Sequence, residues 1–196
     1  MWILSASMAK IYITKQNLLA MLPEKLSKAE PGPIGGRKAC VALVFYSRND
    51  DIELLLMRRS ERDDDHWSGQ IAFPGGGCEP ADKTYCDTAI RETKEEMGFD
   101  LNQGSKFLGY LKQIKMGVKD IAVIPCVFLI DHEVFISPNA KEVSSYKWIP
   151  IQEFLIDGID AVREVNLRGI KLSVPSFDYQ GYRIWGLTYR IIKSIF

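Results

Sequence analysis

Apolar residues gather in runs whose length and composition predict strands. Residues 39–47 and 51–60 are β-rich, and a short turn-like segment separates them, so they predict a hairpin of central strands. Residues 121–130 are almost entirely apolar, which predicts a strand buried on both faces of a sheet. Two shorter strands are expected at residues 106–113 and 144–149.

Apolar residues also recur at helical spacing. Residues 15–28 keep this spacing until Pro23 interrupts it, and residues 84–97 form a second helical pattern. A short helix is expected after Pro150, and an amphipathic helix is expected at the end of the chain, after a turn around Gly181. Strands on both sides of a central helix, followed by a terminal helix, favour a mixed sheet between helical layers.

The length and composition fit one folded domain. We expect a single domain over residues 1–196, in which residues 1–36 supply an N-terminal helix and a Gly/Pro-rich connector. No apolar run approaches the length of a membrane-spanning helix, so no membrane partner is expected. The opening residues lack the basic segment of a signal peptide, and either Met1 or Met8 could be the start.

Charge and cysteine content narrow the function further. The 25 Lys and Arg residues balance 25 Asp and Glu residues, so no overall attraction for nucleic acid exists and no nucleic-acid partner is expected. The four cysteines form no C-x-x-C pair, and there are two histidines, which disfavours a zinc site. Free thiols are typical of a reducing compartment, so we expect a cytoplasmic protein.

The stretch 75–100 carries the most specific chemical pattern. On the predicted helix, Glu92, Glu95 and Glu96 occupy positions i, i+3 and i+4 and therefore lie on one face. A solvated acidic face is the ordinary explanation of such spacing. The preceding turn, residues 73–77, favours a site instead, because glycines let the backbone approach a ligand and Mg²⁺ binds through carboxylates together with substrate phosphates.

This stretch resembles the signature of the Nudix hydrolase family, usually written G-x5-E-x7-R-E-U-x-E-E-x-G-U, where U is aliphatic. Residues 91–99 match its second half, with Thr93 at an aliphatic position. In the first half, counting from Gly76 makes Asp82 the acid, but eight residues rather than seven then precede Arg91.

An alternative alignment counts from Gly77, which restores the spacing but puts Lys83 at the acid's place. We favour Asp82, because an acid at that position can support the start of the helix.

Sequence outside this signature resembles the coenzyme A pyrophosphatases, a Nudix subgroup. That subgroup has L-L-x-x-R-S leading to G-Q-x-x-F-P-G-G, and this chain reads LLLMRRS and then SGQIAFPGG. The resemblance implies an α/β (α+β) fold, a Nudix-type α/β/α sandwich with a mixed β-sheet. It also implies that residues 75–100 form the loop–helix–loop that carries the chemistry.

The resemblance implies metal-dependent hydrolysis of a diphosphate linkage in a nucleoside diphosphate derivative, with Mg²⁺ or Mn²⁺ as the cofactor. The first hypothesis is coenzyme A, cleaved to adenosine 3′,5′-bisphosphate and phosphopantetheine. The second is a Nudix pyrophosphatase for ADP-ribose, a dinucleotide or a nucleoside triphosphate. The third is a non-catalytic Nudix-fold regulator, which the three glutamates disfavour. The oligomeric state stays open, a homodimer included.

Roles follow for the residues that match the signature. Glu92 and Glu96 are expected to bind metal, with Glu95 as a third ligand and a carbonyl at Gly76 as a backbone ligand. Within the signature, Glu95 and Arg91 are also the catalytic candidates. Arg91 lies four residues before Glu95, so an ion pair can orient that carboxylate.

Glu142 is the leading catalytic candidate outside the signature, because Nudix proteins often place an acid just before the corresponding strand. A surface glutamate beside Lys141 explains it equally well. Asp120 is a weaker candidate and more typical of a turn.

Arg58, Arg59 and Arg62 are candidates to bind phosphate, including a 3′-phosphate of coenzyme A, because a guanidinium matches phosphate oxygens bidentately. The alternative, which has equal weight, is that these arginines form ion pairs with Glu61 and the aspartates at 63–65.

The tryptophans divide by position. Trp67 is a candidate to stack on adenine, although anchoring its own loop is the commoner role of a loop tryptophan. Trp148 and Trp185 are expected in the core.

Overall fold

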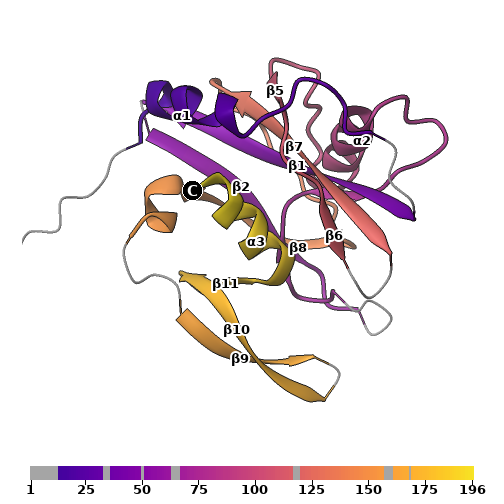
Figure 1. Ribbon diagram of the computed structural model, residues 1–196, viewed down its shortest axis with the longest axis vertical. Helices are drawn as coiled ribbons and strands as arrows, with labels where there is room; N and C mark the ends of the chain where they lie inside the picture. The colour runs from indigo at the N-terminus through magenta and orange to yellow at the C-terminus, as the bar shows by residue number, and fades with distance from the viewer. Residues whose placement is uncertain are drawn as a thin grey trace, which may run out of the picture.

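A computed structural model describes residues 13–32, 36–49, 51–62, 67–116, 120–156, 161–167 and 169–196 (Figure 1). The first half of the chain forms α1 (Lys15–Met21), the 3-10 turn η1 (Leu22–Glu24), β1 (Arg37–Arg48), β2 (Asp51–Arg59), β3 (Ile71–Ala72), β4 (Gly75–Gly77) and α2 (Tyr85–Met97). The second half forms β5 (Lys106–Tyr110), β6 (Ile114–Met116), β7 (Ile121–Ile130), β8 (Val143–Pro150), η2 (Ile151–Phe154), β9 (Ala161–Leu167), β10 (Ile170–Tyr179), β11 (Tyr182–Trp185) and α3 (Gly186–Ile195).

The main sheet is mixed, as predicted. Within the described residues it has eight strands, with β3-β2-β1-β7-β5 in sequence across the sheet and β4, β6 and β8 paired to β1, β7 and β2. β1 pairs antiparallel with β2, which confirms the predicted hairpin, and parallel with β7. From residue 122 onward β7 is buried, because it lies inside the sheet with helices over both faces.

Helices cover both faces of this sheet (Figure 1). On one face, Ala89 and Met97 of α2 pack in a cluster with Val44 of β1. On the other face, Leu18 of α1 and Ile192 of α3 pack in a second cluster. Because successive side chains of a strand point to opposite faces, the long apolar run of β1 contributes side chains to both clusters. The α/β/α sandwich is therefore confirmed.

Three predicted elements are shorter than expected. The N-terminal helix ends at Met21 and continues as the 3-10 turn η1, because Pro23 has no N–H to continue the α-helical hydrogen bonds. The strand expected at 106–113 ends at Tyr110. The helix after Pro150 is also a 3-10 turn, η2.

A second sheet was not predicted. Strands β9, β10 and β11 pair antiparallel in the order β11-β10-β9, and in Figure 1 they extend away from the main sheet at the foot of the view. Val162 and Ile170 are 71% and 61% exposed, so the usual alternation of buried and exposed positions is absent there. Phe177 anchors β10 in the core beside Phe154, and α3 follows β11 as expected.

Two expectations from composition can be compared with the described residues. None of their helices is long and apolar enough to cross a membrane. Cys40, Cys78, Cys86 and Cys126 are all free, and Cys40 and Cys126 are buried, which agrees with the prediction of unpaired thiols.

Candidate active site

Helix α2 has strong signals at both ends. Thr84 accepts a hydrogen bond from the backbone N–H of Asp87 (3.0 Å), and Asp87 accepts one from the backbone N–H of Thr84 (2.9 Å), so a capping box begins the helix. Gly98, at φ 74°, ends it in the left-handed conformation. Thr93, at the aliphatic position of the signature, is fully buried, and its hydroxyl donates to the carbonyl of Ala89 at 2.7 Å.

The three glutamates of α2 differ sharply in exposure. The side chain of Glu96 is 2% exposed, that of Glu92 is 15% exposed and that of Glu95 is 54% exposed. Glu96 accepts a hydrogen bond from the backbone N–H of Gly75 at 2.8 Å, and the guanidinium of Arg59 lies 3.7 Å from its other oxygen. The acidic face is therefore partly enclosed, which argues against a simple solvated surface.

The glycine turn fits closely around these carboxylates. A Cβ atom on Gly76 would lie 2.5 Å from the carboxylate of Glu92, so a side chain there would displace Glu92. Gly75 has φ 153°, and a Cβ atom on it would lie 2.2 Å from the carbonyl oxygen of Cys40. β4, which contains both glycines, pairs with β1 and is thereby fixed against α2.

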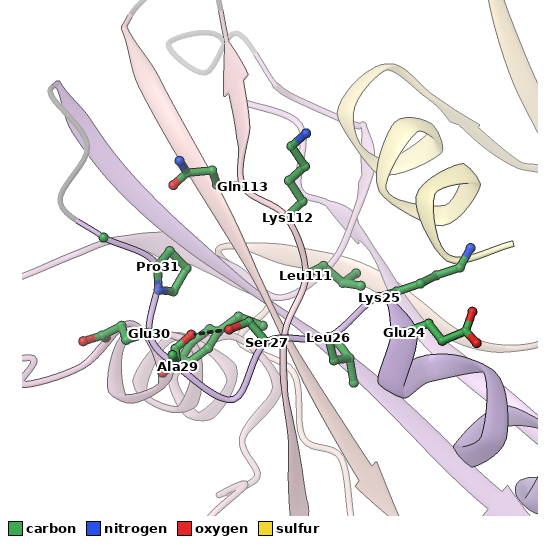
Figure 2. Close-up of a pocket in the computed structure, with 12 residues that line it drawn as sticks. Glu24, Lys25, Leu26, Ser27, Ala29, Glu30, Pro31, Leu111, Lys112 and Gln113 are labelled. Atoms are coloured by element: carbon green, nitrogen blue, oxygen red, sulfur yellow. Dashed lines mark hydrogen bonds between the residues drawn. The ribbon is translucent and has the colours of Figure 1, made fainter.

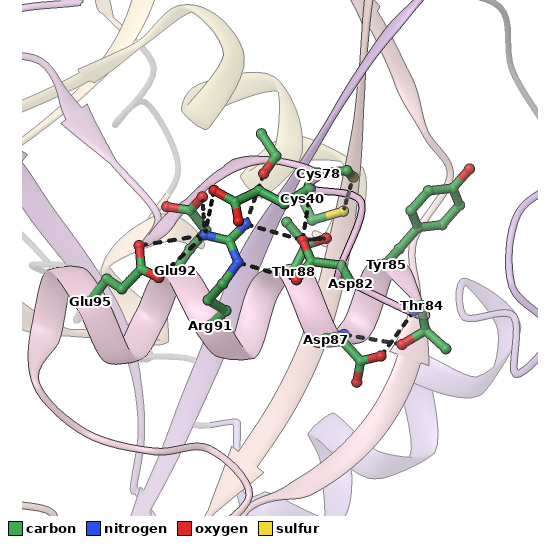
Figure 3. A network of polar contacts seen from close by, with 12 residues as sticks. Cys40, Cys78, Asp82, Thr84, Tyr85, Asp87, Thr88, Arg91, Glu92 and Glu95 are labelled. Carbon is green, nitrogen blue, oxygen red and sulfur yellow. Dashed lines mark hydrogen bonds and ion pairs between the residues drawn. The ribbon is translucent and has the colours of Figure 1, made fainter.

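Arg91 joins the turn to the helix (Figure 3). Its guanidinium donates to the carbonyl of Gly77 at 2.9 Å, to Glu92 at 2.9 Å and to Glu95 at 3.4 Å. The predicted ion pair with Glu95 is thus present, and Arg91 also restrains Glu92.

Asp82 completes this network. Its carboxylate accepts two hydrogen bonds from Arg91, both at 3.1 Å, and one from the hydroxyl of Thr88 at 2.9 Å. These bonds hold the pKa of Asp82 down at about 2. Thr88 belongs to the first turns of α2. Asp82 therefore contacts both the start of the helix and Arg91, the role that we expected when we aligned Asp82 with the acid of the Nudix signature.

The acidic cluster has the electrostatics of a cation site. Burial, together with the charges of Glu92 and Glu142, raises the pKa of Glu96 to about 8, and burial also raises the pKa of Glu92. Among the described residues no three His, Cys, Asp or Glu side chains already surround one metal position. Buried, mutually repelling carboxylates are the oxygen ligands that a divalent cation would neutralise, so Glu92 and Glu96 suit such an ion. Glu95 is more exposed and pairs with Arg91, and its role as a ligand, like that of the carbonyl of Gly76, stays a prediction.

Glu142 lies near this cluster. It is half-buried just before β8, and its charge contributes to the raised pKa of both Glu92 and Glu96. The side-chain amide of Asn139 donates to its carboxylate at 3.1 Å, and the backbone N–H of Asn139 donates to the carbonyl of Glu96 at 2.9 Å. The loop before β8 is therefore attached to the C-terminal end of α2. Asp120, by contrast, is exposed at a turn, with φ 46°.

The candidate phosphate-binding arginines separate in space. Arg58 donates to the carbonyl of Gly181 at 2.6 Å and lies over the ring of Tyr182, so it ties the β10–β11 turn to β2. Arg59, the next residue, lies beside Glu96 and lines the pocket described below. The backbone N–H of Arg62 donates to the hydroxyl of Ser68 at 2.8 Å within their shared loop.

A pocket of about 410 Å³ opens beside the glycine turn. It is lined by Gly75, Gly76 and Gly77, and by apolar side chains of several elements, among them Phe73, Val123 and Leu187. Its charged lining side chains within the described residues are Arg37, Lys38 and Arg59. Trp67 lines it, and its contact with substrate stays a prediction. Trp185 also lines it and is only half-buried, so its expected place in the core was wrong.

A larger hollow of about 570 Å³ lies elsewhere, between residues 24–32 and residues 110–113 (Figure 2). Its charged lining side chains are two acids and two bases, Glu24, Glu30, Lys25 and Lys112. It contains none of the carboxylates of α2 and has no cationic excess for a phosphate group. The smaller pocket is therefore the better candidate for a substrate.

Comparisons with known proteins agree with this geometry. The chain matches the NUDIX domain family over residues 36–168. It is 35% identical over 142 residues to the uncharacterized Nudix hydrolase NudL of Photorhabdus laumondii, covering 72% of this chain and 74% of that protein. It is 34% identical over 163 residues to Nudix hydrolase 22, chloroplastic, of Arabidopsis thaliana, covering 80% of this chain and 53% of that protein.

The fold is also found in solved structures. A MutT/nudix family protein from Enterococcus faecalis has a TM-score of 0.53 to this chain at 13% identity, covering 93% of this chain and 68% of that one. This likeness concerns the fold alone, while the family follows from the sequence match and the identities above. The chain belongs to the Nudix hydrolase family.

Proposed function

We propose that this Nudix hydrolase cleaves the diphosphate linkage of coenzyme A, releasing adenosine 3′,5′-bisphosphate and phosphopantetheine. Membership of the family gives the reaction class, hydrolysis of a nucleoside diphosphate derivative with a divalent metal ion. The observation that carries the substrate proposal is the position of a cationic pocket directly beside the acidic cluster, with the Gly75–Gly77 turn between them.

The pocket supports a substrate with more than one anionic group. Arg37, Lys38 and Arg59 line it, and no Asp or Glu stands among its described lining residues. Coenzyme A carries a 3′-phosphate in addition to its diphosphate, so it would use such a positive lining more fully than a simple diphosphate ester. The resemblance to coenzyme A pyrophosphatases in residues 54–60 and 68–76 supports the same substrate.

Glu92 and Glu96 would hold Mg²⁺ or Mn²⁺, with Glu95 and the carbonyl of Gly76 as further ligands. A bound ion would neutralise the diphosphate and supply an activated water. Arg91 holds Glu92 and the carbonyl of Gly77 by hydrogen bonds, which keeps the helix and the turn in register for the substrate.

Glu142 is the proposed proton acceptor. It would take a proton from the attacking water, while the amide of Asn139 fixes its carboxylate. The oxygen of the water bonds to one phosphorus, the bond from that phosphorus to the bridging oxygen breaks, and the bridging oxygen leaves as part of the second phosphate. One water is consumed, and two phosphate-ended products form.

A hydrolysis panel tests the substrate. Coenzyme A, ADP-ribose, NADH and nucleoside triphosphates are compared with Mg²⁺ or Mn²⁺, and products are identified by mass spectrometry. We expect coenzyme A to have the highest kcat/KM and to yield adenosine 3′,5′-bisphosphate. A higher kcat/KM for another substrate would overturn the coenzyme A proposal and keep the hydrolase. Binding of these compounds without turnover would indicate a non-catalytic regulator.

A further inference from the structure

The junction of β11 and α3 forms one wall of the 410 Å³ pocket. Four successive residues line it there, Trp185, Gly186, Leu187 and Thr188. This wall comes from the C-terminal part of the chain, far in sequence from the carboxylates of α2. None of its residues belongs to the Nudix signature.

Two contacts fix the wall in place. Trp185 pairs in the sheet with Ser176, which is fully buried. The hydroxyl of Thr188 donates to the carbonyl of Ile71 in β3 at 2.9 Å. β3 leads through Phe73 into the glycine turn, so the backbone that carries Trp185 is held at a set position relative to the catalytic turn.

The lining chemistry indicates what the wall faces. Phe73 and Leu187 line the pocket along with the half-buried indole, while Arg37 and Lys38 supply positive charge. A cationic lining suits phosphate, and an indole offers a flat π-surface on which a nucleobase stacks. Gly186 also lines the pocket, and apart from its chain neighbours no atom lies within 4 Å of a Cβ placed on it, so the wall is open at this residue.

We propose that Trp185 stacks on the nucleobase of the substrate and is a specificity-determining residue. The inference rests on the proposed function for the identity of the nucleotide, and on the pocket for the role of the ring. Trp185 contributes to binding and makes no contact with the reacting phosphorus, so its loss affects KM rather than kcat.

A pair of matched probes tests this role. The probes are α,β-methylene-ADP, which is not hydrolysed, and methylenediphosphonate, which lacks the nucleoside, and their binding is measured by calorimetry in the presence of Mg²⁺. Trp185→Ala is expected to weaken the binding of α,β-methylene-ADP about tenfold, the typical effect of losing one stacked base, and to leave methylenediphosphonate unchanged. Trp185→Phe keeps a ring and is expected to retain most of the affinity. Equal weakening of both probes, or unchanged binding of α,β-methylene-ADP, would overturn the proposal.

Two further variants separate binding from folding. Trp185→Leu keeps apolar volume without a π-surface, and it decides the question if Trp185→Ala does not fold. Trp148→Phe is the matched control, since Trp148 packs on Tyr46 with ring centroids 5.4 Å apart, in the cluster beneath α2. If binding of α,β-methylene-ADP depends on Trp185 while no panel compound is hydrolysed, the proposed function fails and this inference stands. If Trp185→Leu hydrolyses coenzyme A with an unchanged KM, the proposed function stands and the inference about Trp185 fails.

Discussion

Arg91 and Asp82 form a two-point ion pair in which Nε and Nη2 of the guanidinium each donate to the carboxylate at 3.1 Å. The same guanidinium donates to Glu92 and to the carbonyl of Gly77. Asp82 therefore acts on the acidic cluster through Arg91, although one additional residue separates the two compared with the usual Nudix spacing.

Replacing Asp82 tests this connection. Asp82→Asn keeps the shape but removes the charge, so Arg91 loses its two-point partner and the restraint on Glu92 weakens. We expect kcat to fall about tenfold, as is common when a residue that orients a metal ligand is removed. Stability is expected to fall by about 1.5–3 kcal/mol, the scale of hydrogen bonds to charged groups. Enzyme kinetics and thermal unfolding measure the two effects, and an unchanged kcat would remove Asp82 from the catalytic network.

The pH dependence of stability follows from the same pair. The pKa of Asp82 is about 2 in the folded chain, while an unpaired aspartate titrates near ~3.9. The depressed pKa means that Asp82 stabilises the fold above about pH 4, and that this contribution is lost as the pH falls toward 2. Urea unfolding of the wild type and Asp82→Asn should therefore give midpoints that converge between pH 5 and pH 2.5. A difference between the two urea midpoints that stays constant over this pH range would show that Asp82 does not titrate in this way.

Gly76 allows a close comparison with its neighbour. Gly76→Ala places a Cβ atom 2.5 Å from the carboxylate of Glu92, whereas a Cβ atom on Gly77 meets nothing within 4 Å. Because a displacement of about 1 Å in a catalytic group can cost about a hundredfold in rate, we expect Gly76→Ala to lose activity on that scale. Gly77→Ala should lose far less, although Gly77 lines the pocket, because its Cβ would not reach Glu92. Similar kcat values for the two variants would contradict a tight fit between the turn and Glu92.

Adjacent arginines should differ in their effects. Arg59 lines the pocket and lies 3.7 Å from Glu96, so Arg59→Met is expected to lower kcat/KM about tenfold or more. Arg58 bonds the carbonyl of Gly181, so Arg58→Met is expected to lower thermal stability with a much smaller change in kcat/KM. Comparable losses of kcat/KM in both variants would favour the alternative in which both arginines contact substrate phosphates.

Spacing along the chain was enough to predict the acidic face, because a helix fixes which residues share a side. The burial of Glu96 could not be predicted in that way, since it depends on the N–H of Gly75 and the guanidinium of Arg59, which other elements supply. The sequence made Arg58 and Arg59 equivalent candidates for phosphate binding. The structure distinguishes them, because Arg58 contacts Gly181 whereas Arg59 lies beside Glu96. The second sheet could not be predicted, because the exposed strands β9 and β10 lack the alternation that would have revealed it. The core assignment of Trp185 was wrong, because its half-buried side chain lies at the end of β11, where the chain lines the pocket.

The central claim is that the carboxylates of α2 carry metal-dependent hydrolysis. The most direct measurement is kcat of Glu96→Gln with saturating Mn²⁺ on the best substrate of the panel, beside Glu24→Gln, whose carboxylate lies in η1, outside the acidic cluster. We predict that Glu96→Gln loses more than about a hundredfold in kcat, beyond the loss seen when only a supporting residue of a metal site is removed. Glu24→Gln should match the wild type. A kcat for Glu96→Gln within a few-fold of the wild type would contradict the account.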